Sequence, residues 1–149
     1  MKLITSILVI QLFSISTFAK NRYGLGVMIG APTGISAKIL RSKKHPLDAG
    51  ISFGNNFEVH STYLLPQKKR LVLERTRLRW YWGIGGKLKS VDKKDEDDEI
   101  YLGPRASIGI NHYFKKLSLE GFAESAINVF VLPSSDVDLD ITIGARYYF

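Results

Sequence analysis

The sequence predicts an all-β fold, an eight-stranded antiparallel up-and-down transmembrane β-barrel. Three observations lead to this prediction. The first nineteen residues have the pattern of an export signal, and apolar and polar residues alternate with a period of two through the rest of the chain. Glycine is concentrated on the polar face of that alternation.

The composition limits the classes of protein that the chain can form. Its 149 residues are enough for one domain, and 45% hydrophobic residues are too many for a disordered polyelectrolyte. Because the chain has no cysteine, a disulfide scaffold, a thiolate zinc site and a catalytic cysteine are excluded. The formal charge of +7 by itself would permit an anionic partner such as a nucleic acid.

Residues 1–19 match a secretory signal peptide. Lys2 supplies the basic start, an apolar run occupies residues 3–10, and Thr17 and Ala19 are the small residues before a cleavage site. A membrane-spanning helix would need roughly 20 predominantly apolar residues, and polar residues interrupt this run.

Cleavage after Ala19 would leave residues 20–149 as the barrel, with 20 basic and 14 acidic residues and a formal charge of +6. An exported protein meets no cytosolic nucleic acid, so we expect no nucleic-acid partner.

The alternation defines the strands in chain order. The first four are predicted at 23–29, 34–40, 47–53 and 57–65, and the last four at 78–89, 100–111, 117–128 and 138–149. In the last of these strands, the apolar and polar residues lie on separate faces without exception. The apolar face carries Leu139, Ile141, Ile143, Ala145, Tyr147 and Phe149.

The apolar faces of the other strands carry, in order, Tyr23, Leu25, Val27 and Ile29; Ile35, Ala37 and Ile39; Leu47, Ala49, Ile51 and Phe53; Phe57, Val59 and Tyr63; Leu78, Trp80, Trp82, Ile84 and Leu88; Ile100, Leu102, Ala106, Ile108 and Ile110; Leu117, Leu119, Ala123 and Ile127. Breaker residues at 30–34, 54–56 and 133–136 and a polar turn at 114–116 separate consecutive strands. Hairpins in sequence without helical crossovers favour a meander.

Two architectures share this alternation. In a soluble barrel the apolar face points inward, whereas in a membrane barrel it contacts lipid and the polar face fills the lumen. The many glycines of the polar face favour the membrane barrel. Glycine weakens a strand and is poorly explained on a surface that faces water, whereas a narrow eight-stranded interior has room for large side chains only where small residues alternate with them. The glycines of the polar face are Gly24, Gly26, Gly50, Gly83, Gly85, Gly103, Gly109 and Gly144.

Charges on the polar face cancel, six against six, as a closed lumen of low dielectric constant requires. We therefore expect a salt-bridge network that closes the lumen, in contrast to porins, which use roughly 16–18 strands. The predicted network is Lys38, Asp48, Glu58, His60, Arg79, Lys87, Arg105, Glu120, Glu124, Asp138, Asp140 and Arg146, and Lys89 shares the same face.

Aromatic residues lie near strand ends on the apolar face, as in the interfacial girdles of membrane barrels. They are Tyr23, Phe53, Phe57, Trp80, Trp82, Tyr147 and Phe149. The first three predicted strands are shorter than the roughly 9–11 residues of a spanning strand. Either those strands extend further or the barrel is short on one side.

The closing residues, with Tyr147 and Phe149 on the apolar face, resemble the C-terminal signal through which bacterial outer-membrane barrels engage the barrel-assembly machinery. Segments GLGVMIGAPTG (24–34), LDAGISF (47–53), YWGIG (81–85), LPSSD (132–136) and RYYF (146–149) are similar to a small, functionally uncharacterised family of eight-stranded outer-membrane barrels. More broadly, residues 20–149 resemble OmpA- and OmpX-type barrels. The resemblance implies the bacterial outer membrane, with its lipid and lipopolysaccharide as partners. Segment 67–77 departs from it, being longer and more basic.

With both termini in the periplasm, the connections near 30–34, 54–56, 89–99 and 129–137 would face outside. The basic turns at 41–45, 67–77 and 114–116 would then face the periplasm. We expect a structural, adhesive or loop-mediated binding role, and the sequence does not identify an extracellular ligand. We expect no enzymatic activity, cofactor or metal.

Two alternatives stay open. One is an enzyme modifying lipid A, of acyl-hydrolase type, for which Glu58, His60 and Thr62 share the lumen face. The other is a soluble, lipocalin-like periplasmic barrel. The acidic run 92–99 carries carboxylates that suit a divalent cation, although a solvated loop is the simpler interpretation.

Overall fold

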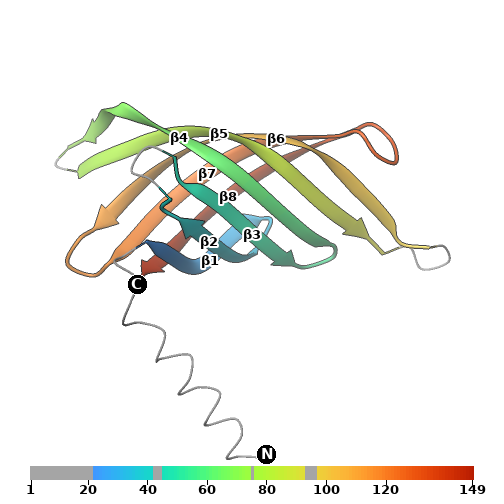
Figure 1. Cartoon of the computed structure of the whole chain (residues 1–149), viewed down its shortest axis with the longest axis horizontal. Coiled ribbons are helices and arrows are strands. Elements are labelled where there is room, and N and C mark those ends of the chain that lie inside the picture. The colour runs from blue at the N-terminus through green and yellow to red at the C-terminus, as the bar shows by residue number, and fades with distance from the viewer. Residues whose placement is uncertain (1–21, 42–44, 75, 93–96) are drawn as a thin grey trace, which may run out of the picture.

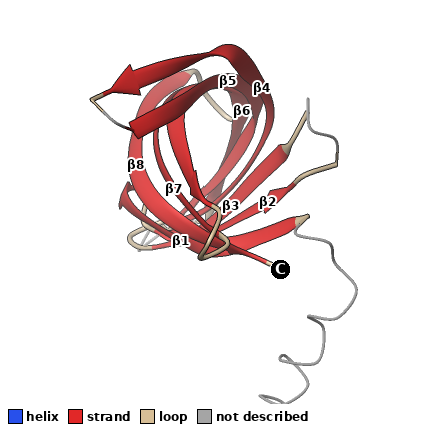
Figure 2. Ribbon diagram, turned by 90° about the vertical axis from the view of Figure 1, so that its left-hand side faces the viewer, coloured by secondary structure: helices blue, strands red, loops and turns tan. Residues whose placement is uncertain are grey.

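The computed structural model describes residues 22–41, 45–74, 76–92 and 97–149. Within them the chain forms a closed barrel in which each strand pairs antiparallel with its neighbour in sequence and β1 pairs with β8 (Figures 1 and 2). The strands are β1 (Tyr23–Ala31), β2 (Gly34–Ile39), β3 (Leu47–Phe53), β4 (Phe57–Leu73), β5 (Thr76–Val91), β6 (Glu99–Phe114), β7 (Leu119–Phe130) and β8 (Asp136–Tyr148).

The predicted fold class, an all-β barrel of eight antiparallel up-and-down strands, is confirmed by this topology. In the described part of the chain, no helix is long and apolar enough to cross a membrane. The predicted signal peptide, residues 1–19, lies outside the described residues.

The barrel is much taller on one side than on the other. Strands β4, β5 and β6 have 17, 16 and 16 residues, whereas β2 and β3 have 6 and 7. Figure 1 shows the long strands extending past the short ones at both ends. Both explanations for the short predicted strands therefore hold in part. β1 extends two residues beyond its predicted end, to Ala31, whereas β2 and β3 are short because the barrel is short on that side.

The prediction of a basic turn at 67–77 is wrong. These residues continue the β4–β5 hairpin, whose turn comes at Glu74, with a positive φ of 54°. The pairing of β4 with β3 ends at Tyr63, and beyond it β4 pairs with β5 alone, with a register shift between Pro66 and Arg70. Pro66 and the basic run that follows it are tolerated because this part of β4 is a sheet edge, where proline loses no ladder bond and charges protect the edge.

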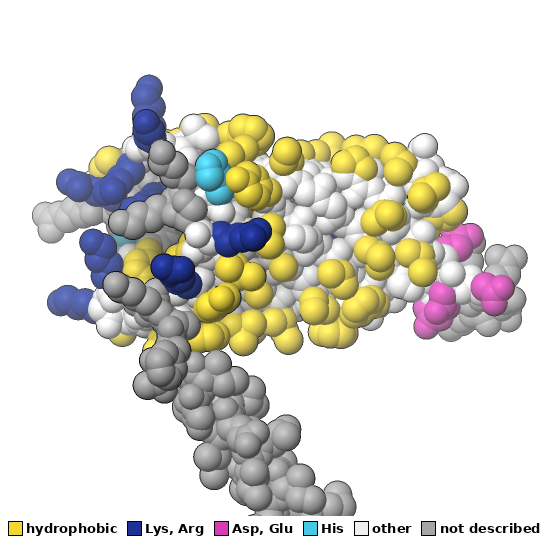
Figure 3. All heavy atoms as spheres, in the orientation of Figure 1, with side chains coloured by type: hydrophobic (Ala, Val, Ile, Leu, Met, Phe, Trp, Pro, Cys, Tyr) yellow, Lys and Arg dark blue, Asp and Glu magenta, His cyan; other side chains and the backbone are white. Residues whose placement is uncertain are grey.

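Polar side chains fill the interior and apolar side chains cover the outside. Arg146 and Lys87 are each 1% exposed, whereas Ile29 and Ile143 are 62% and 61% exposed. Figure 3 shows the apolar side chains covering the middle of the wall, with Lys and Arg at one end and Asp and Glu at the other. We call these the basic end, which carries Arg77 and Lys115, and the acidic end, which carries Asp92 and Asp136.

Inward-facing glycines lie directly opposite large inward side chains. Gly50 pairs with His60, and a Cβ at Gly50 would lie 2.3 Å from His60 Cε1. Gly144 pairs with Phe122, and a Cβ there would lie 2.5 Å from the ring. These two glycines thus provide the space that large side chains of a narrow lumen occupy, whereas at Gly26, Gly85 and Gly103 a Cβ would meet the backbone of a neighbouring strand.

Candidate functional site

The first group of buried ion pairs lies in the lumen toward the basic end and is centred on Arg146. Its guanidinium donates hydrogen bonds to Asp48 and, at 2.9 Å, to the Ser36 hydroxyl. Glu120 lies 3.7 Å from Arg146 Nη1 and accepts a hydrogen bond of 2.6 Å from Lys38. All these residues are at most 4% exposed, so the charges neutralise one another with little help from solvent.

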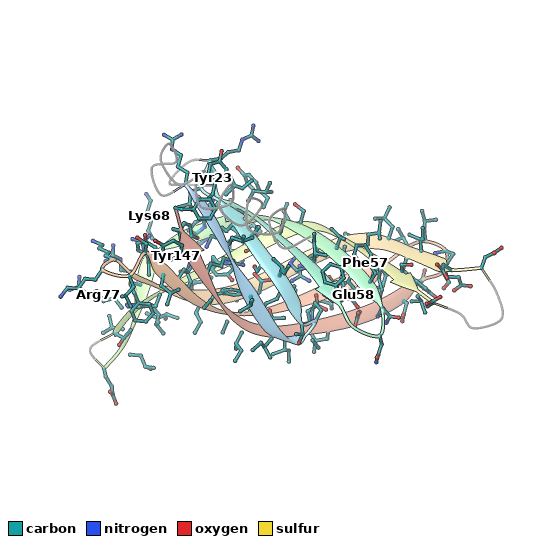
Figure 4. The ribbon with its side chains drawn as sticks, turned by 90° about the horizontal axis from the view of Figure 1, so that it is seen from below. Tyr23, Phe57, Glu58, Lys68, Arg77 and Tyr147 are labelled. Carbon is teal, nitrogen blue, oxygen red and sulfur yellow. The ribbon has the colours of Figure 1, made fainter. Side chains whose placement is uncertain are left out.

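The second group lies toward the acidic end and is centred on Lys87. The Lys87 ammonium is 2.7 Å from Asp140, 2.9 Å from Glu58 and 3.5 Å from Asp138. Lys89 joins the group by pairing with Asp138 at 3.1 Å. Figure 4 shows Glu58 beside Phe57 on this side of the barrel.

Arg105 links the second group to the middle of the lumen. It donates hydrogen bonds to Asp140, to Glu124 at 2.8 Å and to the Asn128 amide oxygen at 3.1 Å. Glu124 in turn accepts a hydrogen bond of 3.0 Å from the Tyr81 hydroxyl. The Tyr81 ring lies 5.6 Å from Lys38 Nζ, which brings the two groups together.

Neutral residues complete the network, and sequence reasoning did not assign them to it. Tyr148 donates its hydroxyl hydrogen to Glu120, and Asn111 Nδ2 donates to the same carboxylate at 2.6 Å. Ser36, Asn128 and Tyr81 also contribute hydrogen bonds. Their alternating positions place them on the same face as the charges, so the period of two would have identified them.

Arg79 is the predicted network residue that lies outside the network. Its side chain is exposed at the basic end and makes no ion pair with a described residue. Arg79 alternates with the inward-facing residues of β5. Its partners on the neighbouring strands are Arg70 and Asn111, which lie closer to the basic end than the ends of β2 and β3. There Arg79 lines a cavity at the basic end and not the ion-pair network, so parity alone could not assign it to the network.

Above the first ion-pair group, the basic end holds a cavity of about 350 Å³. Lys38, Glu120 and Tyr148 line it together with Arg70, Arg77 and Arg79. Below this cavity the interior is occupied by the ion pairs and by buried rings such as Phe122 and Phe130. The lumen thus has a cavity at the basic end, with buried ion pairs and rings beneath it.

The three residues of the candidate catalytic row, Glu58, His60 and Thr62, do not hydrogen-bond to one another in the described part of the chain. His60 Nε2 faces Asp48 at 3.8 Å, and Glu58 is paired with Lys87. The Thr62 hydroxyl has no hydrogen-bond partner in the described part of the chain. His45 stacks on Tyr63, and His112 packs edge-on against Phe114.

The acidic run is described only in part, because residues 93–96 lie outside the described residues. A hydrogen bond with Asp92 and its negative charge raise the pKa of Asp98 above its usual value. Among the described residues, no three His, Cys, Asp or Glu side chains gather closely enough to hold a metal ion.

The two residues of the proposed assembly signal lie where β8 closes the barrel. Tyr147 is exposed on the outer face and pairs with Leu25 of β1 and Leu119 of β7. Figure 4 shows Tyr147 and Tyr23 at the same end of the barrel, opposite Phe57. The backbone N–H of Phe149 donates a 3.1 Å hydrogen bond to the Tyr23 carbonyl, extending the β8–β1 closure.

No family model and no curated protein matches the sequence. Among solved structures, the barrel is similar to the N-terminal β-barrel domain of OprF from Pseudomonas aeruginosa, with a TM-score of 0.57 and 10% identity. The alignment covers 85% of this chain and 95% of that chain. At this identity the likeness shows the fold alone, and membership of one small family stays a prediction.

Proposed function

We propose that this chain is an outer-membrane β-barrel whose outer face contacts lipid and whose closed lumen gives it a structural or loop-mediated binding role, without a pore. The observation that carries the proposal is the inverted distribution of polarity. Buried ion pairs occupy the inside, and exposed isoleucine and leucine side chains cover the outside.

The outer face supports a lipid environment over water. Leu139, Ile141 and Ile143 project from one strand and are each about 60% exposed, and Ile29 of β1 continues the same surface. Soluble monomers rarely expose a continuous apolar surface larger than a few hundred Å². A soluble barrel that binds an apolar ligand would bury these side chains and expose the charges, which is the reverse of the arrangement here.

The closed lumen supports a role other than diffusion of solutes. Arg146, Arg105 and Lys87 pair inside the barrel with carboxylates on other strands, and rings such as Phe122 and Phe130 are buried in the same interior. An eight-stranded barrel has only enough interior for its own side chains. The connections at the ends are then the surfaces through which partners would bind.

The experiment combines membrane fractionation with a single substitution at mid-height. The unboiled protein should partition with the outer membrane and run at a different mobility from the boiled protein. Replacing Ile143 with Arg should lower the free energy of unfolding in lipid by about 2–4 kcal/mol, the cost of an arginine near the bilayer midplane.

The matched control is Leu132→Arg, in the β7–β8 connection, where the side chain is 57% exposed. This change should cost no more than about 0.5 kcal/mol, as for ordinary surface substitutions. If Ile143→Arg costs no more than Leu132→Arg, or if the protein stays in the soluble fraction, the outer face does not contact lipid and the proposal fails.

A further inference from the structure

We infer that the basic-end cavity is a binding site for a phosphate group. This site does not depend on the proposed membrane role, because the same residues line the cavity whether lipid or water surrounds the barrel. The cavity volume of about 350 Å³ lies within the usual range of small-ligand sites, about 300–1,000 Å³.

Cationic side chains dominate the cavity rim. Arg70, Arg77, Arg79 and Lys115 line the cavity, and none of them makes an ion pair with a described residue. The carboxylate in the cavity, Glu120, is committed to Lys38, to Arg146 and to two neutral donors below the rim. The positive charge at the rim is therefore uncompensated by the described part of the protein.

The register of the β4–β5 hairpin places two of these charges face to face. Arg70 is the direct partner of Arg79, immediately after the register shift at Pro66. Like charges directly opposite each other destabilise a pair of strands. Asn111, the partner of Arg79 on β6, brings no negative charge. An anion held between the two guanidinium groups would convert this repulsion into two favourable contacts.

Phosphate fits this arrangement better than a carboxylate. The guanidinium fork matches phosphate oxygens and can donate two parallel hydrogen bonds to them. A phosphate monoester carries close to two negative charges near neutral pH, and Arg77 and Lys115 provide cations beyond the facing pair. The cavity wall also includes Leu40, Leu64 and Trp80, so an apolar group attached to the phosphate would have a surface to contact.

The test measures binding of inorganic phosphate and of lysophosphatidic acid to the whole barrel, by isothermal titration calorimetry in a neutral detergent at constant ionic strength. Acetate serves as the carboxylate comparison. We expect at least one phosphate ligand to bind more tightly than acetate. Binding of inorganic phosphate assigns the site to free phosphate, and binding of lysophosphatidic acid alone assigns it to a lipid headgroup.

The decisive variant is the double substitution Arg70→Gln and Arg79→Gln, which should weaken phosphate binding by about tenfold or more, the loss expected from removing charge-assisted hydrogen bonds. Its matched control is the double substitution Lys69→Gln and Lys116→Gln. Both lysines are exposed and do not line the cavity, and the control removes two positive charges, as the Arg70 and Arg79 variant does. The control should change the affinity for phosphate by no more than about twofold, because salt screens the long-range attraction between the anion and distant charges.

Thermal unfolding shows that the double variant folds and provides a second readout. Phosphate should raise the melting temperature of the wild type but not of the double variant, since a ligand stabilises only the state that binds it. Without phosphate, the double variant should melt no lower than wild type, because the facing charges are gone. The inference is overturned if neither phosphate ligand binds, if acetate binds equally well, or if the control variant weakens binding as much as the double variant.

Discussion

Replacing Arg146 with Met is expected to destabilise the barrel more than any surface change. The substitution leaves Asp48, which is 1% exposed, with His60 Nε2 at 3.8 Å as its nearest basic group. Removing one partner of a buried ion pair costs about 3–5 kcal/mol, because the remaining charge is buried without compensation. Glu120 is affected less, since Lys38 still donates to it at 2.6 Å.

A double-mutant cycle isolates the interaction between the two charges. Asp48→Leu should cost about 3–5 kcal/mol by the same reasoning, whereas the double variant should lie within about 1 kcal/mol of wild type. The two single costs should therefore exceed the cost of the double variant by more than about 3 kcal/mol.

The assay is urea-induced unfolding of the barrel in phospholipid vesicles, followed by the mobility of unboiled samples on a gel. Lys69→Met is the control, because Lys69 is exposed and makes no ion pair with a described residue. The control should cost no more than about 0.5 kcal/mol. Single costs that add within about 0.5 kcal/mol in the double variant would refute the view that the two side chains form a coupled buried pair.

Two further predictions concern the filled interior. Gly50→Ala should destabilise the barrel by about 1–3 kcal/mol, because the new Cβ would lie 2.3 Å from His60 Cε1, and His60→Ala should restore most of that loss. Gly54→Ala, where nothing lies within 4 Å, should be nearly neutral in the same unfolding assay, and equal costs at the two positions would contradict the packing argument. In planar bilayers the wild-type barrel should show no stable ion conductance, since ion pairs and buried rings lie across the lumen below the basic-end cavity. A steady conductance carried by single barrels would contradict a closed lumen.

Much of the fold follows from the sequence because the side-chain period of a strand is fixed. The strand at 47–53 has the predicted bounds, and the inward positions of β6 follow from alternation alone. The sequence predicts a turn at 67–77 because proline and consecutive basic residues usually mark a turn. Those signals do not report that β3 is too short to cover this part of β4, which depends on the lengths of other strands.

In the lumen, too, the sequence predicts less than the structure shows. Parity identifies Lys38, Arg146 and Lys87 as inward residues, but it does not give their partners. Lys38 of β2 pairs with Glu120 of β7, and Arg146 of β8 pairs with Asp48 of β3, across the lumen between strands that do not adjoin. Such pairs depend on the stagger of the closed barrel, which no single strand encodes.

The orientation of the outer face is tested most directly by the fluorescence of Trp82. The side chain is 42% exposed on the outside of β5, and the chain has two tryptophans, so Trp80→Phe leaves Trp82 as the reporter. In vesicles of lipid brominated along the acyl chains, Trp82 fluorescence should be strongly quenched, while aqueous iodide should have little effect. Quenching by iodide without quenching by the brominated lipid would show that water covers this face, and would contradict a barrel that spans the membrane.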